Sequence, residues 1–212
     1  MSGQKKQVRR FLLATWTCFL LVTLSAPAFS YLTSALPMQG PQAGADVQFS
    51  SGSMLDDSLM SLKSDLMAQG ISSASMVTYG TVLSDENVVP NSPNTNARGA
   101  VGAVLVGDRL VVRGSFGNLT SQMRDYATDP VNPPNTDITS AFHIHMGPST
   151  ENGPFQYALD VSTDETGRSG SATGEYMLTA EQVQALQNGM LYSDLHTVDN
   201  RGGELRGILM PY

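Results

Sequence analysis

Cysteine is almost missing from this chain of 212 residues, and the one that is present, Cys18, lies in an apolar stretch near the N-terminus. The rest of the chain therefore offers no thiolate for a metal site, no cysteine nucleophile and no disulfide. A domain without these features must be held together by its apolar core.

Basic residues are also few. The chain has 12 lysines and arginines against 19 aspartates and glutamates, which gives a formal net charge of −7. Because an acidic surface repels phosphate backbones, we do not expect a nucleic-acid partner. The sequence also lacks a Gly-x-Ser-x-Gly elbow, a phosphate-binding glycine loop and a His-Glu-x-x-His helix. These absences favour a non-catalytic protein over an enzyme.

No apolar run has the length of a typical membrane span. Residues 11–24 form an apolar run of 14 residues, whereas a span needs about 20. Lysines and arginines precede this run, and small residues follow it around Ala28. This succession predicts a signal peptide in residues 1–30, cut after Ala28 or Ser30, with an uncleaved anchor as the alternative. We expect a secreted or periplasmic protein with no stable membrane span after cleavage.

Residues 31–74 are predicted to form a linker and an amphipathic helix. The linker, residues 31–53, is rich in proline, glycine and small polar residues. The helix is expected from Ser53, as its N-cap, to Gln69, with Gly70 as the stop. Two aspartates would lie in its first turn, and four leucines form one stripe: Asp56 and Asp57, then Leu55, Leu59, Leu62 and Leu66.

This helix has two interpretations. It could dock on a membrane or a partner, or it could pack on the protein's own domain. The polar face lacks the lysines of a membrane-surface helix, which favours packing on the domain. We place the helix outside the folded domain, which is expected to span residues 75–212 and to fold without it.

Residues 75–212 show the period of two and the glycine-rich turns that are typical of β-strands. A short helix interrupts them, with Thr179 and Gln182 as a capping box and Gly189 as its end. Strands are predicted at residues 76–83, 100–106, 110–116, 141–146, 155–160, 169–177, 191–197 and 204–209. The pattern predicts an all-β fold, an antiparallel Greek-key-like sandwich or barrel with one inserted helix.

All three histidines of the chain lie in two of these predicted strands. His143 and His145 share a strand face because side chains alternate along a strand, and His196 could join them from the later strand. Three imidazoles at one point would suit a copper or zinc ion. Alternatively, the histidines bind neighbouring backbone groups and hold the loop of residues 147–154.

Three charged residues lie on the predicted strand of His196 or on the strand that follows it. Asp194 shares a strand face with His196 and could be a fourth ligand or an acceptor for an imidazole N–H. Glu204 and Arg206 share a face of the last predicted strand. They could line the same site as a charged pair, or they could form an ion pair that only braces the strand.

The motifs of this region resemble those of the chordin-type (CHRD) domain family, over about residues 75–210. They are residues 83–90 (LSDENVVP), 142–147 (FHIHMG), 152–154 (NGP), 189–192 (GMLY), 195–197 (LHT) and 203–207 (GELRG). The resemblance implies an all-β fold and a single-domain exported member, and it implies little about activity. Asp194 stands where the family more usually has Asn. The His-x-His strand with a distant histidine is also similar to copper–zinc superoxide dismutase, without that enzyme's cysteine pair and further histidines.

Three hypotheses about function follow. The first is an exported, non-catalytic module that binds one metal ion, copper before zinc, through His143, His145 and His196. The second is a structural or adhesion module that binds an extracellular protein or a polysaccharide and holds no metal. The third is a metal oxidoreductase similar to superoxide dismutase, which needs an open coordination position.

Overall fold

The computed structural model describes residues 50–212. The predicted signal peptide and most of the predicted linker lie outside the described residues. Within residues 50–212, no helix combines the length and the apolar character that a membrane crossing requires.

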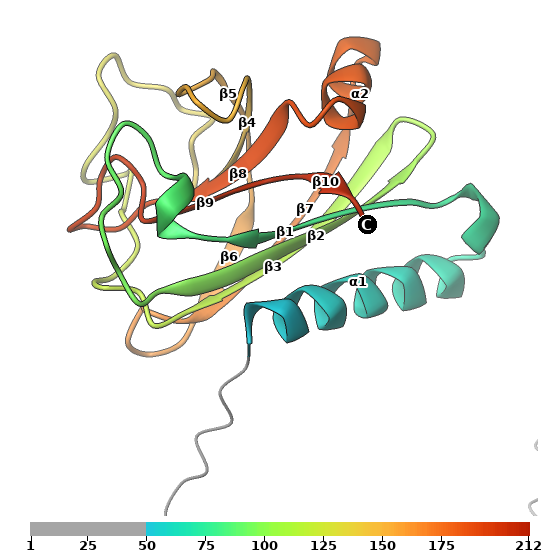
Figure 1. Cartoon of the computed structure of the whole chain (residues 1–212), viewed down its shortest axis with the longest axis horizontal. Helices are drawn as coiled ribbons and strands as arrows, with labels where there is room; N and C mark the ends of the chain where they lie inside the picture. The colour runs from blue at the N-terminus through green and yellow to red at the C-terminus, as the bar shows by residue number, and fades with distance from the viewer. Residues whose placement is uncertain (1–49) are drawn as a thin grey trace, which may run out of the picture. The chain divides into compact units, whose positions relative to one another are not determined.

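Two antiparallel β-sheets form the domain, with the strand orders β10-β1-β2-β3-β7-β6 and β5-β4-β8-β9 (Figure 1). The strands are β1 (Val77–Leu83), β2 (Arg98–Val106), β3 (Arg109–Gly117), β4 (Phe142–Met146), β5 (Phe155–Ala158), β6 (Asp160–Thr163), β7 (Gly170–Met177), β8 (Leu191–Leu195), β9 (Leu205–Ile208) and β10 (Met210–Pro211). One apolar core contains residues from both sheets, such as Val112 and Phe116 from β3 and Ile144 from β4. The predicted all-β sandwich is confirmed.

Each predicted strand overlaps a strand of the structure, but one prediction merged two strands. Residues 155–160 were expected to be continuous, whereas β5 belongs to the four-stranded sheet and β6 to the six-stranded sheet. The chain changes sheets at Leu159, whose side chain is fully buried and whose N–H donates to the Phe142 carbonyl at 2.9 Å. A period of two cannot reveal such a crossing, because both strands have the same alternation.

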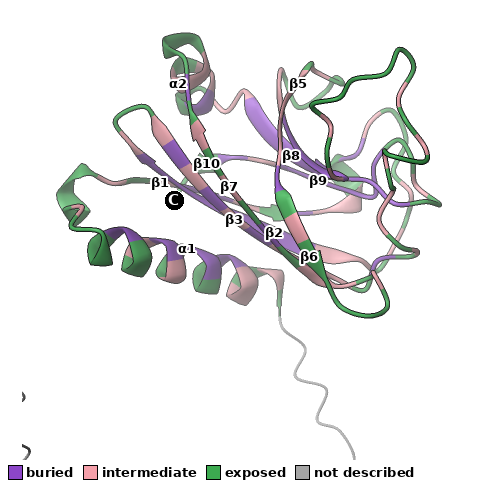
Figure 2. Ribbon diagram, turned by 180° about the vertical axis from the view of Figure 1, so that it is seen from behind, coloured by how far each residue is buried: buried purple, intermediate pink, exposed green. Residues whose placement is uncertain are grey.

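The alternation along β4 sets which side chains face the core. Phe142 and Ile144 are fully buried in the core between the sheets. His143 and His145 therefore lie on the opposite, outer face of the four-stranded sheet. The neighbouring strand β8 is buried along its whole length, because loops cover its outer face as well (Figure 2).

The long helix α1 (Ser51–Ala68) lies on the outer face of the six-stranded sheet, against β1, β2 and β3 (Figure 1). The predicted leucine stripe is confirmed: Leu55, Leu59, Leu62 and Leu66 are all buried. Where the helix rests, the sheet has glycines, Gly80 and Gly102, in place of larger side chains. A Cβ at Gly80 would lie 2.8 Å from Leu55, and one at Gly102 would lie 2.9 Å from Leu59. The helix thus packs on the domain and belongs to the same compact unit as the strands.

The N-cap of α1 differs from the prediction. The cap is Ser50, whose side chain accepts from the backbone N–H of Ser53 at 3.2 Å. The Ser53 hydroxyl instead donates to the Ser50 carbonyl at 2.8 Å, so Ser53 is already inside the helix. As a consequence, the first turn contains no acidic residue, and Asp56 and Asp57 lie beyond it. Gly70 follows the helix with φ of +86°, as expected of a glycine stop.

The short helix α2 (Ala180–Gln187) connects β7 to β8. Its predicted capping box is confirmed, with Thr179 and Gln182 bonded in both directions. Gly189 has φ of +67° just beyond the helix end, and the chain then enters β8, the strand that carries Asp194.

Candidate metal centre

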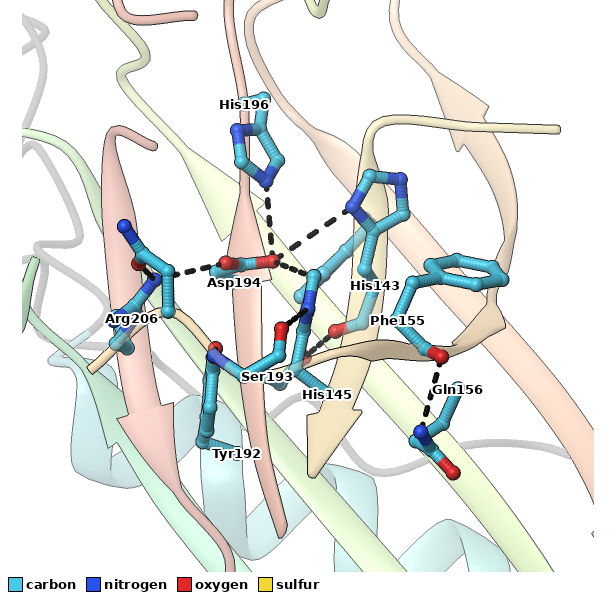
Figure 3. A network of polar contacts seen from close by, with 12 residues as sticks. His143, His145, Phe155, Gln156, Tyr192, Ser193, Asp194, His196 and Arg206 are labelled. Carbon is cyan, nitrogen blue, oxygen red and sulfur yellow. Dashed lines mark hydrogen bonds and ion pairs between the residues drawn. The ribbon is translucent and has the colours of Figure 1, made fainter. Parts of the chain in front are cut away.

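The site lies on the outer face of the four-stranded sheet, where β4 and β8 run side by side. The antiparallel register sets His143 opposite Asp194 and His145 opposite Tyr192. His196 follows β8 directly and shares the face of Asp194, because the two residues are two positions apart. Figure 3 shows the three imidazoles turned towards the Asp194 carboxylate.

Four ligand atoms converge at this point, one each from His143, His145, His196 and Asp194. All four lie within 4.8 Å of one another. Oδ1 of Asp194 is 3.7 Å from Nδ1 of His143, 3.1 Å from Nε2 of His145 and 3.2 Å from Nε2 of His196. A tetrahedral zinc ion with bonds of about 2.0–2.1 Å needs ligand atoms about 3.3 Å apart, which these distances approach.

Each imidazole is anchored by its other ring nitrogen to a backbone carbonyl. Nε2 of His143 is 2.6 Å from the Ser140 oxygen, and Nδ1 of His145 is 3.0 Å from the Gly153 oxygen. Nδ1 of His196 is 3.0 Å from the oxygen of Arg201. A carbonyl can only accept, so these nitrogens carry the hydrogens. In a neutral ring, the nitrogen that faces the cluster then has a free lone pair, as a metal ligand requires.

The two interpretations of the histidines are therefore compatible. The backbone contacts expected if the histidines only hold neighbouring segments are present, including the contact of His145 with the loop of residues 147–154. The same contacts orient the rings as the first interpretation requires.

Three of the converging atoms have no hydrogen-bond partner among the described residues. They are Nε2 of His145, Nε2 of His196 and Oδ1 of Asp194, and all three are buried. Nε2 of His145 and Nε2 of His196 lie 3.1 Å and 3.2 Å from Oδ1 of Asp194. Buried polar atoms without a partner are costly, and a group of them around one point is typical of a site for an ion or a water.

The electrostatics of the site favour a charged carboxylate and a neutral His143. Burial, together with the charge of His196, lowers the pKa of His143 to about 3. Burial alone would raise the pKa of Asp194, but His196 and His145 hold it well below its ordinary value. Burial also works against protonation of His145, but Asp194 outweighs it and raises the pKa of His145. The Asp194 carboxylate is therefore ionised and His143 is neutral at neutral pH.

Arg206 holds the other oxygen of Asp194. Its Nη2 lies 3.2 Å from Oδ2 of Asp194, and the side chain is almost completely buried. The guanidinium carbon lies 4.4 Å from the centre of the Tyr192 ring, and Tyr192 in turn stacks on His145 at 5.2 Å. Arg206 therefore lies beside the three histidines and Asp194, whereas the sequence suggested that Glu204 and Arg206 would line the site as a pair.

Glu204 lies elsewhere and pairs with neither Arg206 nor the histidines. Its buried carboxylate accepts from the hydroxyls of Thr95, Thr120 and Thr197 and from the N–H of Thr120, at 2.7–3.1 Å. It is not among the four residues whose ligand atoms converge. The structure pairs Arg206 with Asp194 in place of the ion pair expected between Glu204 and Arg206.

Aromatic rings surround the cluster, and the sequence patterns did not predict them. The ring centre of Tyr126 lies 5.3 Å from that of His143 and 6.4 Å from that of His196. The ring centre of Phe155 lies 5.4 Å from that of His143. Burial raises the pKa of Tyr126 to about 12, which keeps its hydroxyl neutral. Tyr192 could have been found from the sequence, since it shares the strand face of Asp194. Tyr126 could not, because it comes from the proline-rich loop between β3 and β4.

Comparison with known proteins gives one match. The model of the CHRD domain family matches residues 79–209. These residues include all four converging residues and both sheets, except the first two residues of β1 and the whole of β10. No curated protein matches the chain. No solved structure matches it.

Proposed function

The chain belongs to the CHRD domain family, and from this premise we propose that its domain is a non-catalytic module that binds one metal ion. The ligands are His143, His145, His196 and Asp194. A single observation carries the proposal: buried donor atoms from these residues converge, while the remaining nitrogens of all three rings are held by backbone carbonyls.

Zinc is the ion that fits this arrangement best. In a square plane, which copper(II) prefers, one histidine nitrogen would lie opposite the carboxylate oxygen, at about 4.1 Å for bonds of this length. All three nitrogens lie only 3.1–3.7 Å from that oxygen. The two shorter distances match a tetrahedral ion such as zinc, and the 3.7 Å distance lies midway between the two geometries. Zinc is therefore the proposed ion, and the copper that the sequence suggested is tested beside it in the experiment below.

The donor set supports a structural ion over a catalytic one. Four protein ligands complete a tetrahedron, whereas catalytic zinc sites usually keep one position for water or substrate. Tyr126, Phe155 and Tyr192 pack around the imidazoles and restrict the space for a further ligand. The oxidoreductase hypothesis needs the open position that this donor set lacks.

Export is part of the proposal, supported by the basic, apolar and small-residue succession of residues 1–30. The mature protein should begin near Phe29 or Tyr31. N-terminal sequencing of the exported protein tests this, and a sequence that still starts at Met1 would contradict cleavage.

Metal titration of protein purified without a histidine tag tests the main claim. After removal of metal with a chelator, the protein should bind one zinc ion. Copper(II) should bind to the same site as well, since sites of nitrogen and oxygen ligands generally hold copper(II) more tightly than zinc. The variants His145→Ala and Asp194→Asn should lose tight binding, because each removes one ligand. Asp199→Asn, which changes an exposed carboxylate nearby, serves as the matched control and should bind as the wild type does.

Two results would contradict the proposal. Tight copper(II) binding with little affinity for zinc would refute the choice of metal but keep the site. A wild-type protein that binds no divalent ion would refute the site itself, and the structural or adhesion module would then be the better hypothesis.

A further inference from the structure

Arg206 connects the candidate metal centre to a loop that covers it. On one side, Nη2 of Arg206 donates to Oδ2 of Asp194 at 3.2 Å. On the other side, the same Nη2 donates to Oδ1 of Asn152 at 2.7 Å, and Nη1 donates to the Glu151 carbonyl at 3.3 Å. Asn152 and Glu151 both belong to the loop of residues 147–154, between β4 and β5, which we call the 147–154 loop.

The same loop is bound to the site by two further contacts. The carbonyl of Gly153 accepts from the outer ring nitrogen of His145 at 3.0 Å. The N–H of Gly153 donates to the hydroxyl of Tyr192 at 2.7 Å, and the ring of Tyr192 lies between His145 and the guanidinium of Arg206. His145, Tyr192 and Arg206 thus form a stack beneath the loop, and each member has a hydrogen bond to it (Figure 3).

The closed loop leaves little freedom at Gly153. A Cβ at this position would collide with the Met146 carbonyl, so only glycine fits without a shift of the backbone. The two contacts of Gly153 therefore depend on the close approach of its backbone to the Met146 carbonyl. By contrast, the side chains of neighbouring Thr150 and Asn152 are exposed.

We propose that Arg206 couples the ion to the 147–154 loop, so that metal binding orders the loop and the closed loop slows release of the ion. This inference rests on the proposed metal site. An ion bound to Oδ1 fixes the Asp194 carboxylate, and its second oxygen then fixes the guanidinium that holds Asn152 and Glu151. The coupling is reciprocal, because a contact that favours the loaded state must also be favoured by it.

Asn152 provides the test, because it is exposed and lies outside the ligand set. Asn152→Ala removes the acceptor for Arg206, whereas Asn152→Asp keeps one. Thr150→Ala changes an exposed side chain on the same loop and serves as the control. The measurements are amide hydrogen exchange of residues 147–154 with and without zinc, and the rate of zinc release to a chromogenic chelator.

Zinc should slow exchange in this loop in the wild type, in Thr150→Ala and in Asn152→Asp. In Asn152→Ala most of this slowing should be lost, and zinc should leave about ten- to a hundredfold faster, the size expected for one hydrogen bond to a charged group. An Asn152→Ala variant with wild-type release and exchange would overturn the role of the contact.

The inference and the proposed function fail in different ways. If the wild type binds zinc but its loop exchanges at the same rate with and without the ion, the coupling is refuted and the metal site stands. If the wild type binds no divalent ion, both are refuted together.

Discussion

Oδ1 of Asp194 lies 3.1 Å from Nε2 of His145, and neither of these buried atoms has a hydrogen-bond partner among the described residues. Nε2 of His196 lies 3.2 Å from the same oxygen, and it too is buried without a hydrogen-bond partner among the described residues. In a buried site the usual solution is a hydrogen bond, and here the outer ring nitrogens already donate to carbonyls. The inner atoms are thus placed where they could share one cation, as the proposed site requires.

Zinc uptake should release protons and should weaken in acid. The pKa of His145 is raised by Asp194, so in the metal-free protein this ring keeps its proton to a higher pH than a free histidine does. Because a protonated imidazole cannot coordinate, binding must displace that proton. Calorimetric titration in buffers of different ionisation enthalpy measures the number released. A proton count of zero at about pH 6.5, the ordinary value for histidine, would contradict the raised pKa of His145.

The stability of the metal-free protein should depend on His143 and His145 with opposite signs. The pKa of His143 is lowered to about 3, so below about pH 6.5 the unfolded chain binds the extra proton and the folded protein loses stability by up to about 1.4 kcal/mol per pH unit. The raised pKa of His145 does the reverse: its contribution is full below about pH 6.5 and is lost as pH rises through its folded value.

Single variants separate these two effects. Between about pH 7.5 and about pH 5, His145→Gln should lose more stability than the wild type, and His143→Gln should lose less. Urea unfolding in the presence of a chelator measures both. The same acid sensitivity in the two variants would contradict the assignment.

Glu204 should contribute to stability without binding the ion. Its fully buried carboxylate accepts from three threonine hydroxyls and one backbone N–H. Glu204→Gln would turn an amide N–H₂ towards these donors, and we expect a loss of about 2–3 kcal/mol in the free energy of unfolding. The variant should still bind one zinc ion, and Glu165→Gln, at an exposed position, should change neither quantity. Loss of zinc binding in folded Glu204→Gln would show that Glu204 belongs to the site.

The helix α1 should be needed for full stability. The side chain of Leu62 is almost completely buried against the sheet, so Leu62→Ala should cost about 2–5 kcal/mol. Met60 is 68% exposed on the same helix, and Met60→Ala should change stability by no more than about 0.5 kcal/mol.

These contacts of α1 also change our expectation for a chain that starts at Ser75. Residues 75–212 were expected to fold without the helix. Loss of α1 would expose Ala100 and Val104, which are fully buried beneath it. The truncated protein should therefore unfold at lower urea concentration than residues 50–212. Equal stability of the two would show that the helix only rests on the sheet.

The sequence was most informative where a short period controls the structure. Alternation along β4 placed His143 and His145 on one face, and the spacing of Asp194 and His196 placed these two together. The leucine stripe of α1 was equally clear, because residues three and four apart share a helix face. These features need only local geometry, so they can be derived without knowledge of the fold.

The parts that the sequence did not predict depend on contacts between distant segments. The carbonyls of Ser140, Gly153 and Arg201 come from three different loops, and nothing in their sequence marks them as acceptors for imidazoles. The threonines around Glu204 come from three segments, one of which, the connection between β8 and β9, also carries Arg201. The start of α1 was missed for another reason: Ser50, Ser51 and Ser53 are all competent N-caps, and propensity alone cannot choose among them.

His143 and His196 are far apart along the chain, so an ion bound at the proposed site would also restrict the unfolded chain. An ion that holds both residues is a crosslink across a segment of about fifty residues. For a disulfide that closes a loop of this size, the lost entropy of the unfolded chain corresponds to a stabilising free energy of about 4 kcal/mol at room temperature. A protein whose single cysteine lies in its predicted signal peptide would gain such a crosslink outside the cell without any oxidation. Unlike a disulfide, this crosslink would be insensitive to reductants, and it would open in acid or in the presence of a chelator.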